Sequence, residues 1–224
     1  MAAKEKIKRN QTVGEEIANS VSHGVMALFG VLALVLLILK ADGPWEMLSA
    51  IVFGISIILL YAMSTLYHAL AFTKSKSVFK RLDHISIYIL IGGTFAPALL
   101  LLPSLRDKYF LGIEGFLDAG LSLFIIQWIV ITVGIVFKSI WVYRYQALHV
   151  IIFLILGWSA LIFATDLFNQ KPMAFILIFL GGLAYSVGVI FYAKSDIRYF
   201  HFLWHIWVAI GTILQFFAIY LYLI

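Results

Sequence analysis

The sequence predicts an all-α integral membrane protein, a single bundle of seven transmembrane helices. Hydrophobic residues make up 63% of the 224 residues and charged residues only 12%, with a mean hydropathy of +1.04. These values lie far outside the range of soluble globular proteins. A helix needs roughly 20 apolar residues to cross a bilayer. Seven runs of about this length fill the chain after a basic and then polar segment at 1–23, namely 24–40, 47–70, 84–102, 117–137, 147–165, 173–193 and 203–223.

Basic residues lie mainly in alternate connections, and this pattern predicts the orientation of the bundle. The N-terminal segment and the second connection hold four Lys or Arg each, and the fourth (Lys138, Arg144) and sixth hold two each. The other side has only four. Because Lys and Arg accumulate in short cytoplasmic connections, we expect the N-terminus in the cytoplasm and the C-terminus outside. The net charge of +5 reflects this bias, and no motif indicates nucleic acid or a soluble protein partner.

The stretch GEEIANSVSHG precedes the first predicted helix and carries Glu16, Asn19 and His23. Their spacing of three and then four residues puts them near one helical stripe. Two interpretations stay open. The stripe either faces the bundle interior, where it would support a site formed by other helices, or belongs to a solvated amphipathic segment at the cytoplasmic interface.

The second and third predicted helices add polar groups on the same side of the membrane. In AMSTLYHAL, Ser64 and His68 are four residues apart, so both side chains face one way. Asp83 lies where a basic connection gives way to the third helix, and it is either an N-cap or part of a site. His84 points about 100° away around the helix, so we expect Asp83 in a site and His84 at the membrane interface.

Histidines also mark the fifth and seventh predicted helices. His149 is alone near the start of the fifth, where we expect a structural role. In YFHFLWHIW, His201 and His205 share one helical face, with β-carbons about 6 Å apart. Such a pair can bind one zinc ion if further ligands come from other helices. The alternative is that histidine is simply better tolerated at headgroup depth than at the bilayer centre.

Two absences narrow the chemistry of such a site. The chain has no cysteine, which leaves imidazole and carboxylate as the strong protein ligands for a transition metal. The three residues between His201 and His205 include no glutamate, so the zinc-protease pattern with its built-in base is absent. Any general base must therefore come from elsewhere in the chain.

Taken together, four motifs resemble the progestin and adipoQ receptor family, specifically its bacterial haemolysin III branch. They are E-x-x-N-x-x-S-H before the first helix, S-x-x-x-H ending the second, the aspartate before the third, and H-x-x-x-H in the seventh. The resemblance implies an N-inside bundle in a bacterial plasma membrane and a zinc ion near the cytoplasmic face. The family positions that bind this zinc match His68, His201 and His205. Ser64 and Asp83 match polar positions beside it, with Asp83 as a candidate general base.

The resemblance and the residues support two hypotheses of different classes. Three protein ligands leave an open zinc position, as in catalytic sites. The first hypothesis is a zinc-dependent hydrolase in which Asp83 takes a proton from water and Ser64 orients that water or stabilises the oxyanion. Membrane lipids are the expected partners, and a ceramide-like amide or another acyl lipid is the expected substrate.

The alternative is a non-enzymatic sensor or regulator of membrane state, in which a structural zinc fixes one conformation. A haemolysin-type pore or channel ranks behind both, because no charged residue lies near the middle of a predicted span. Only a short polar segment precedes the first helix, whereas receptor members of the family carry a long soluble region there. This difference argues against a hormone-receptor role.

Overall fold

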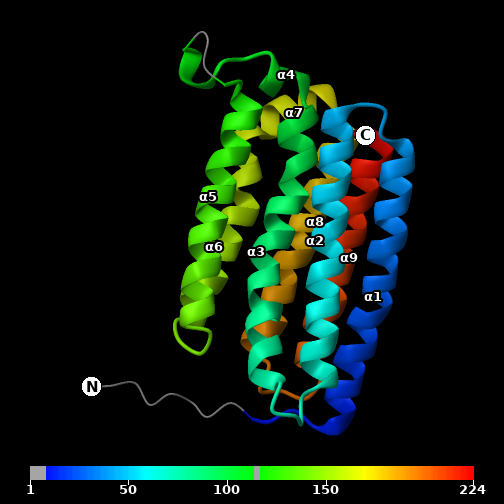
Figure 1. Ribbon diagram of the computed structural model, residues 1–224, viewed down its shortest axis with the longest axis vertical. Coiled ribbons are helices and arrows are strands. Elements are labelled where there is room, and N and C mark those ends of the chain that lie inside the picture. The colour runs from blue at the N-terminus through cyan, green and yellow to red at the C-terminus, as the bar shows by residue number, and fades with distance from the viewer. Residues whose placement is uncertain (1–8, 114–116) are drawn as a thin grey trace.

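The computed structural model describes residues 9–113 and 117–224 and shows a bundle of long helices that run up and down side by side (Figure 1). Lys4, Lys6 and Lys8, which entered the orientation argument, lie outside the described residues. No strand occurs in the described part of the chain. The helical elements are α1 (Val13–Lys40), α2 (Pro44–Ala69), α3 (Lys76–Leu101), α4 (Pro103–Arg106), η1 (Phe110–Gly112), α5 (Ala119–Ile140), α6 (Gln146–Trp158), η2 (Ser159–Phe163), α7 (Ala164–Gln170), α8 (Pro172–Ala193) and α9 (Phe200–Tyr222).

Seven segments among these residues are long and apolar enough to cross a bilayer, which confirms the predicted all-α fold. The fifth crossing, Gln146–Gln170, is assembled from α6, η2 and α7 and is not one continuous helix. At the break, the Ser159 hydroxyl donates to the Leu156 carbonyl at 2.7 Å. Side-chain hydrogen bonds of this kind compete with the regular helix. The apolar composition of residues 147–165 does not indicate such a break, so the sequence predicted one continuous helix there.

α1 begins well before its predicted apolar run, which starts at residue 24. Thr12 is the N-cap, and it forms a capping box with Glu15. The Glu15 amide donates to the Thr12 hydroxyl, and the Glu15 carboxylate accepts from the Thr12 amide at 2.8 Å. GEEIANSVSHG is therefore the first part of the spanning helix.

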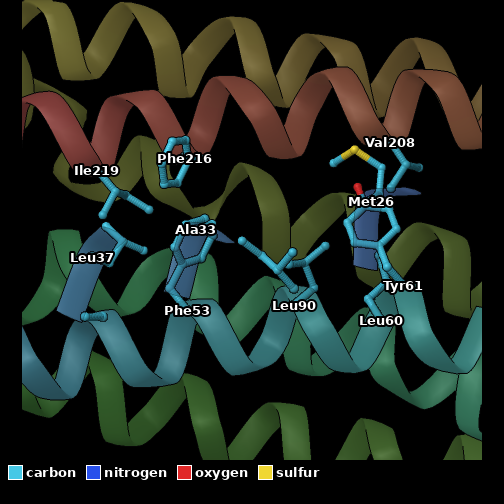
Figure 2. Close-up of a cluster of buried hydrophobic side chains, with 12 residues drawn as sticks. Met26, Ala33, Leu37, Phe53, Leu60, Tyr61, Leu90, Val208, Phe216 and Ile219 are labelled. Atoms are coloured by element: carbon cyan, nitrogen blue, oxygen red, sulfur yellow. The ribbon is translucent and has the colours of Figure 1, made fainter. Parts of the chain in front are cut away.

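The larger hydrophobic core lies between α1, α2 and α9. Figure 2 shows Ala33 and Leu37 of α1 packed with Phe53 of α2 and with Phe216 and Ile219 of α9. All five are at most 3% exposed. Because lipid is as apolar as these side chains, close van der Waals packing, more than escape from water, holds the helices together. This packing fixes α9 against α1 and α2.

α1 begins and α9 ends at opposite ends of the bundle (Figure 1). At the end where α1 begins, α2 ends, α3 begins, and α9 begins. We call this the N-terminal end. α4 and α7 lie at the opposite end. The start of α9 is far in sequence from the start of α1 and the end of α2, but all three lie at this end of the bundle.

Candidate metal centre

Three histidines from two helices meet at the N-terminal end. His68 is in the last turn of α2, and His201 and His205 are in the first two turns of α9. One ligand atom from each lies within 4.8 Å of those of the other two. His68 and His205 are 2% and 1% exposed. The structure therefore brings together the three residues that the motif resemblance singled out.

A carboxylate from α1 holds the His68 ring. His68 Nδ1 lies 2.6 Å from Glu16 Oε2, and Lys76 Nζ lies 3.5 Å from the other Glu16 oxygen. In a neutral His68 ring, donation from Nδ1 to this carboxylate leaves the lone pair on Nε2. His68 Nε2 is buried and has no hydrogen-bond partner among the described residues. Metal-binding histidines have this arrangement, with a carboxylate behind the ring.

The backbone of α1 holds His205 in a similar way. His205 Nδ1 lies 3.3 Å from the Asn19 carbonyl oxygen and 3.4 Å from Ser22 Oγ. Donation to the carbonyl would leave His205 Nε2 as the ligand atom. Asn19 is fully buried, and its side chain donates to Gln11 Oε1 at 2.6 Å. Two residues of α1 thus lie directly behind two of the three histidines.

The histidine trio fits a transition metal. Three imidazoles without oxygen ligands suit zinc, copper, iron or nickel better than magnesium or calcium. In a tetrahedral site with Zn–N bonds of about 2.0–2.1 Å, the ligand nitrogens are about 3.4 Å apart. The trio, within 4.8 Å, needs only a small closure to reach that spacing. A metal would also satisfy the unpartnered His68 Nε2, so these residues could hold one.

An acid and a hydroxyl lie beside the trio. The Ser64 hydroxyl donates to the Asp83 carboxylate, which lies within electrostatic reach of His68. Ser64 is one turn before His68 on α2, and it is buried. The Asp83 side chain, two turns into α3, is 14% exposed. α2 and α3 therefore place a carboxylate next to the metal ligands without using it as one of them.

His23 of α1 completes the cluster of imidazoles. Its ring stacks on His205, with centroids 3.5 Å apart and planes at 12°. The ring is 3% exposed, and neither nitrogen has a hydrogen-bond partner in the described chain. Burying two unmet polar atoms is costly unless a ligand or water meets them. His23 therefore offers a polar atom to whatever fills the space beside it.

One cavity joins this cluster to the interior of the bundle. It contains roughly 1690 Å³ of empty space, its open mouth included. At the N-terminal end its wall includes Asp83 and both α9 histidines, and farther along it includes Phe95 of α3 and Phe175 of α8. From Asp83 to Phe95, α3 rises about 18 Å. The cavity is therefore long, polar at one end and largely apolar along the rest.

Comparison with known sequences identifies the family. The family model described as haemolysin-III related matches residues 11–216. The chain belongs to the haemolysin III family. The Hemolysin-3 homolog of Bacillus subtilis is 38% identical over 216 residues, which cover 94% of this chain and 95% of the relative. Hemolysin-3 of Bacillus cereus is 34% identical over 225 residues, or 98% and 97% of the two chains.

A mammalian relative extends the comparison. The monocyte to macrophage differentiation factor of Homo sapiens is 27% identical over 219 residues, covering 95% of this chain and 86% of the relative. These matches confirm the resemblance to the progestin and adipoQ receptor family and its haemolysin III branch. With seven apolar spans among its described residues, this haemolysin III chain is a multi-pass bacterial membrane protein.

The structure removes one alternative and corrects one expectation about the start of α3 in this haemolysin III protein. α3 begins at Lys76 with Ser75 as its N-cap, so Asp83 does not cap the helix. The expectation that His84 lies apart from the Asp83 site is wrong, because both line one cavity and His84 Nε2 is 4.0 Å from Asp83 Oδ2. A turn of 100° does not separate them, since the cavity also extends to α5 and α6.

On α1, burial distinguishes between the two interpretations of the polar stripe. Glu16, Asn19 and His23 are 6%, 0% and 3% exposed. A solvated amphipathic segment would expose these side chains, and the structure places them in the bundle interior. The stripe lies behind the histidine ligands or against the cavity.

Glu15 is a residue of the site region that sequence reasoning missed. Its carboxylate accepts from the Arg9 guanidinium at 2.6 and 2.9 Å and from the backbone amide of Tyr199 at 2.9 Å. Tyr199 is the N-cap of α9, so Glu15 ties the start of α1 to the start of the helix that carries two ligands. The T-x-x-E pattern at Thr12 marks a helix start, but no local pattern indicates the contact with Tyr199.

Proposed function

We propose that this haemolysin III family protein is a zinc-dependent membrane hydrolase that cleaves an amide or ester bond of an acyl lipid. The observation that supports it best is the meeting of His68, His201 and His205 with Asp83 at one end of a long, largely apolar cavity. Zinc follows from the family resemblance and from an imidazole donor set with an open position. The basic residues favour a cytoplasmic location for this end of the bundle.

The residues around the trio have separate tasks in this proposal. When bound, zinc supplies a Lewis acid that polarises the acyl carbonyl and makes water more acidic. Asp83 accepts a proton from the water that attacks the acyl carbon, and returns it to the leaving nitrogen or oxygen as the C–N or C–O bond breaks. The products are a fatty acid and an amine or alcohol. Because Ser64 donates to Asp83, its task is to aim the carboxylate.

The apolar length of the cavity suits an acyl chain. Phe95, Leu167 and Phe175 line it beyond the polar end. The acyl chain of a membrane lipid already lies in hydrocarbon, so close packing against these side chains, more than escape from water, would hold it along the about 18 Å between Asp83 and Phe95. That placement puts the acyl carbonyl at the end where Asp83 lies. A ceramide-like amide and an acyl ester both have a long acyl chain that ends in a carbonyl group.

Elemental analysis coupled to lipid mass spectrometry tests the proposal. Purified wild type and His201→Ala are analysed for metal and incubated with the same lipids. We expect stoichiometric zinc and zinc-dependent release of fatty acid from the wild type, with both lost in His201→Ala. Absence of a bound metal from the wild type would contradict the proposal.

A second candidate function is membrane sensing without turnover. The ligands come from α2 and α9, so a metal ion would link these helices and fix their relative position. Stoichiometric zinc in wild type with no fatty-acid release from any acyl lipid would favour this candidate over the hydrolase.

A further inference from the structure

Lys138 is a buried cation in the cavity wall, apart from the histidine trio. It lies in the last turn of α5, in a part of the chain whose basic residues the sequence placed at the solvent side. Its side chain is 1% exposed, although lysines near helix ends usually extend their ammonium groups to water. Lys138 Nζ donates to Gln146 Oε1 at 2.9 Å. The burial of this charge calls for a physical explanation.

The described chain meets only part of the hydrogen-bonding capacity of Lys138. An ammonium has three N–H donors, and the described residues supply one acceptor, the Gln146 amide oxygen. Asp83 acts on Lys138 electrostatically but forms no direct ion pair with it in the described structure. A buried cation without a hydrogen-bonded counter-ion is costly. Since Lys138 lines the cavity, an anion in the cavity would supply the missing partner.

The groups beside Lys138 are held in place from behind. Gln146 Nε2 donates to the Val142 carbonyl, which leaves the Gln146 oxygen to fix the ammonium. His149 Nδ1 pairs with the Tyr88 hydroxyl at 2.7 Å, so Nε2 is its remaining polar atom. His149 also lines the cavity and is within electrostatic reach of Lys138. Two nitrogen-bearing side chains from α5 and α6 are thus positioned before any ligand arrives.

We propose that Lys138 and His149 form a subsite for the phosphate of an anionic acyl lipid. The assignment rests on the proposed function, which places the acyl chain along the apolar length and the cleaved bond beside Asp83. The headgroup then falls at the polar end of the same cavity, where Lys138 lies. A phosphate has several anionic oxygens and can accept charge-assisted hydrogen bonds from both side chains. The substrate class is a phospholipid or lysophospholipid.

Two ether lipids that differ only in the phosphate test this subsite. They are 1-O-octadecenylglycerol 3-phosphate and 1-O-octadecenylglycerol, which contain no acyl bond to hydrolyse. Purified wild type is expected to bind the phosphate lipid about tenfold more tightly, the scale of one charge-assisted hydrogen bond. Lys138→Met is expected to abolish this preference while binding the neutral lipid as wild type does, and Lys138→Arg to keep it.

Two further variants control for charge and folding. Lys74→Met removes a positive charge from an exposed position in the connection before α3, outside the cavity wall, and is expected to keep the preference. Gln146→Glu is nearly isosteric and places a carboxylate against Lys138. It is expected to remove the preference with the lysine still present, so the subsite can be tested even where Lys138→Met fails to fold.

Several outcomes would overturn the subsite. Equal wild-type affinity for the two ether lipids would do so, and so would equal losses in Lys74→Met and Lys138→Met. Displacement of the phosphate lipid by an equal concentration of inorganic phosphate would assign the site to free phosphate. Lys138-dependent binding of oleate, without any preference for the phosphate lipid, would assign it to a product carboxylate. Since none of these measurements involves turnover, failure of the hydrolase proposal appears separately in the fatty-acid assay.

Discussion

The two ends of the bundle both carry charged side chains, but among the described residues the buried ones gather at the N-terminal end. At the N-terminal end, Glu16 and His68 meet at 2.6 Å and are 6% and 2% exposed. At the opposite end, Lys108 and Asp166 pair at 3.1 Å with side chains 62% and 31% exposed. An exposed pair contributes about 0–1 kcal/mol, whereas polar groups buried in a membrane protein are expensive and usually functional. Burial, more than the presence of charge, therefore distinguishes the site.

Removal of a metal ligand should have the largest effect of these changes, a loss of metal binding at the N-terminal end. We expect His68→Ala, His201→Ala and His205→Ala each to weaken metal binding by more than about 100-fold, because losing a ligand costs more than losing an outer partner. His149→Ala, which removes a histidine held by Tyr88, should keep its metal. Elemental analysis after gel filtration measures the metal content of each variant. Full metal content in the three ligand variants would refute the site.

Neutralising Asp83 should separate chemistry from metal binding. Asp83→Asn keeps the size of the side chain but removes the base, so fatty-acid release should fall by about 10²–10⁴-fold. Zinc content should not change, because Asp83 is outside the ligand trio. The two quantities are measured on one sample. An unchanged rate would show that another group accepts the proton.

Loss of the carboxylate behind His68 should have a smaller effect. Glu16→Gln removes the acceptor that fixes the His68 tautomer, and we expect metal affinity to fall by about 10–100-fold. Competition against a chelator gives the affinity. Glu46→Gln, the same change in the first turn of α2 at the opposite end, should have no effect. Equal losses in both variants would mean that Glu16 acts only through general stability.

The smallest effect is expected from the exposed pair. Lys108→Met should change the free energy of unfolding by less than about 1 kcal/mol and leave the metal content intact. Thermal unfolding in detergent and elemental analysis measure the two. A large loss of either would show that the opposite end also supports the site and would remove the contrast between the two ends.

The sequence predicts the fold well because a bilayer imposes a length of about 20 apolar residues on each crossing. Helix starts were harder, since Thr12 and Ser75 cap α1 and α3 in polar segments outside the apolar runs. The spacing of His201 and His205 predicted a shared face. Their meeting with His68 depends on how α9 packs against α1 and α2, and motif resemblance, not local pattern, supplied that ligand.

Lys138 shows what the sequence could not predict. A lysine at the end of an apolar run is normally interfacial, and it served in the sequence as an indicator of orientation. Its burial depends on Gln146, eight residues later across a turn, and on the cavity between several helices. Such contacts are set by tertiary packing and leave no periodic signal.

The division of the ligands between α2 and α9 also has a consequence for biosynthesis. α9 emerges from the ribosome after α2, and it carries His201 and His205. A nascent chain that has inserted its first six spans has only His68 of the three. A metal ion could contact all three histidines only after α9 has entered the membrane, where the Tyr199 amide at its start donates to Glu15. Metal loading would then indicate that α9 has inserted, and a chain terminated before α9 would stay unloaded.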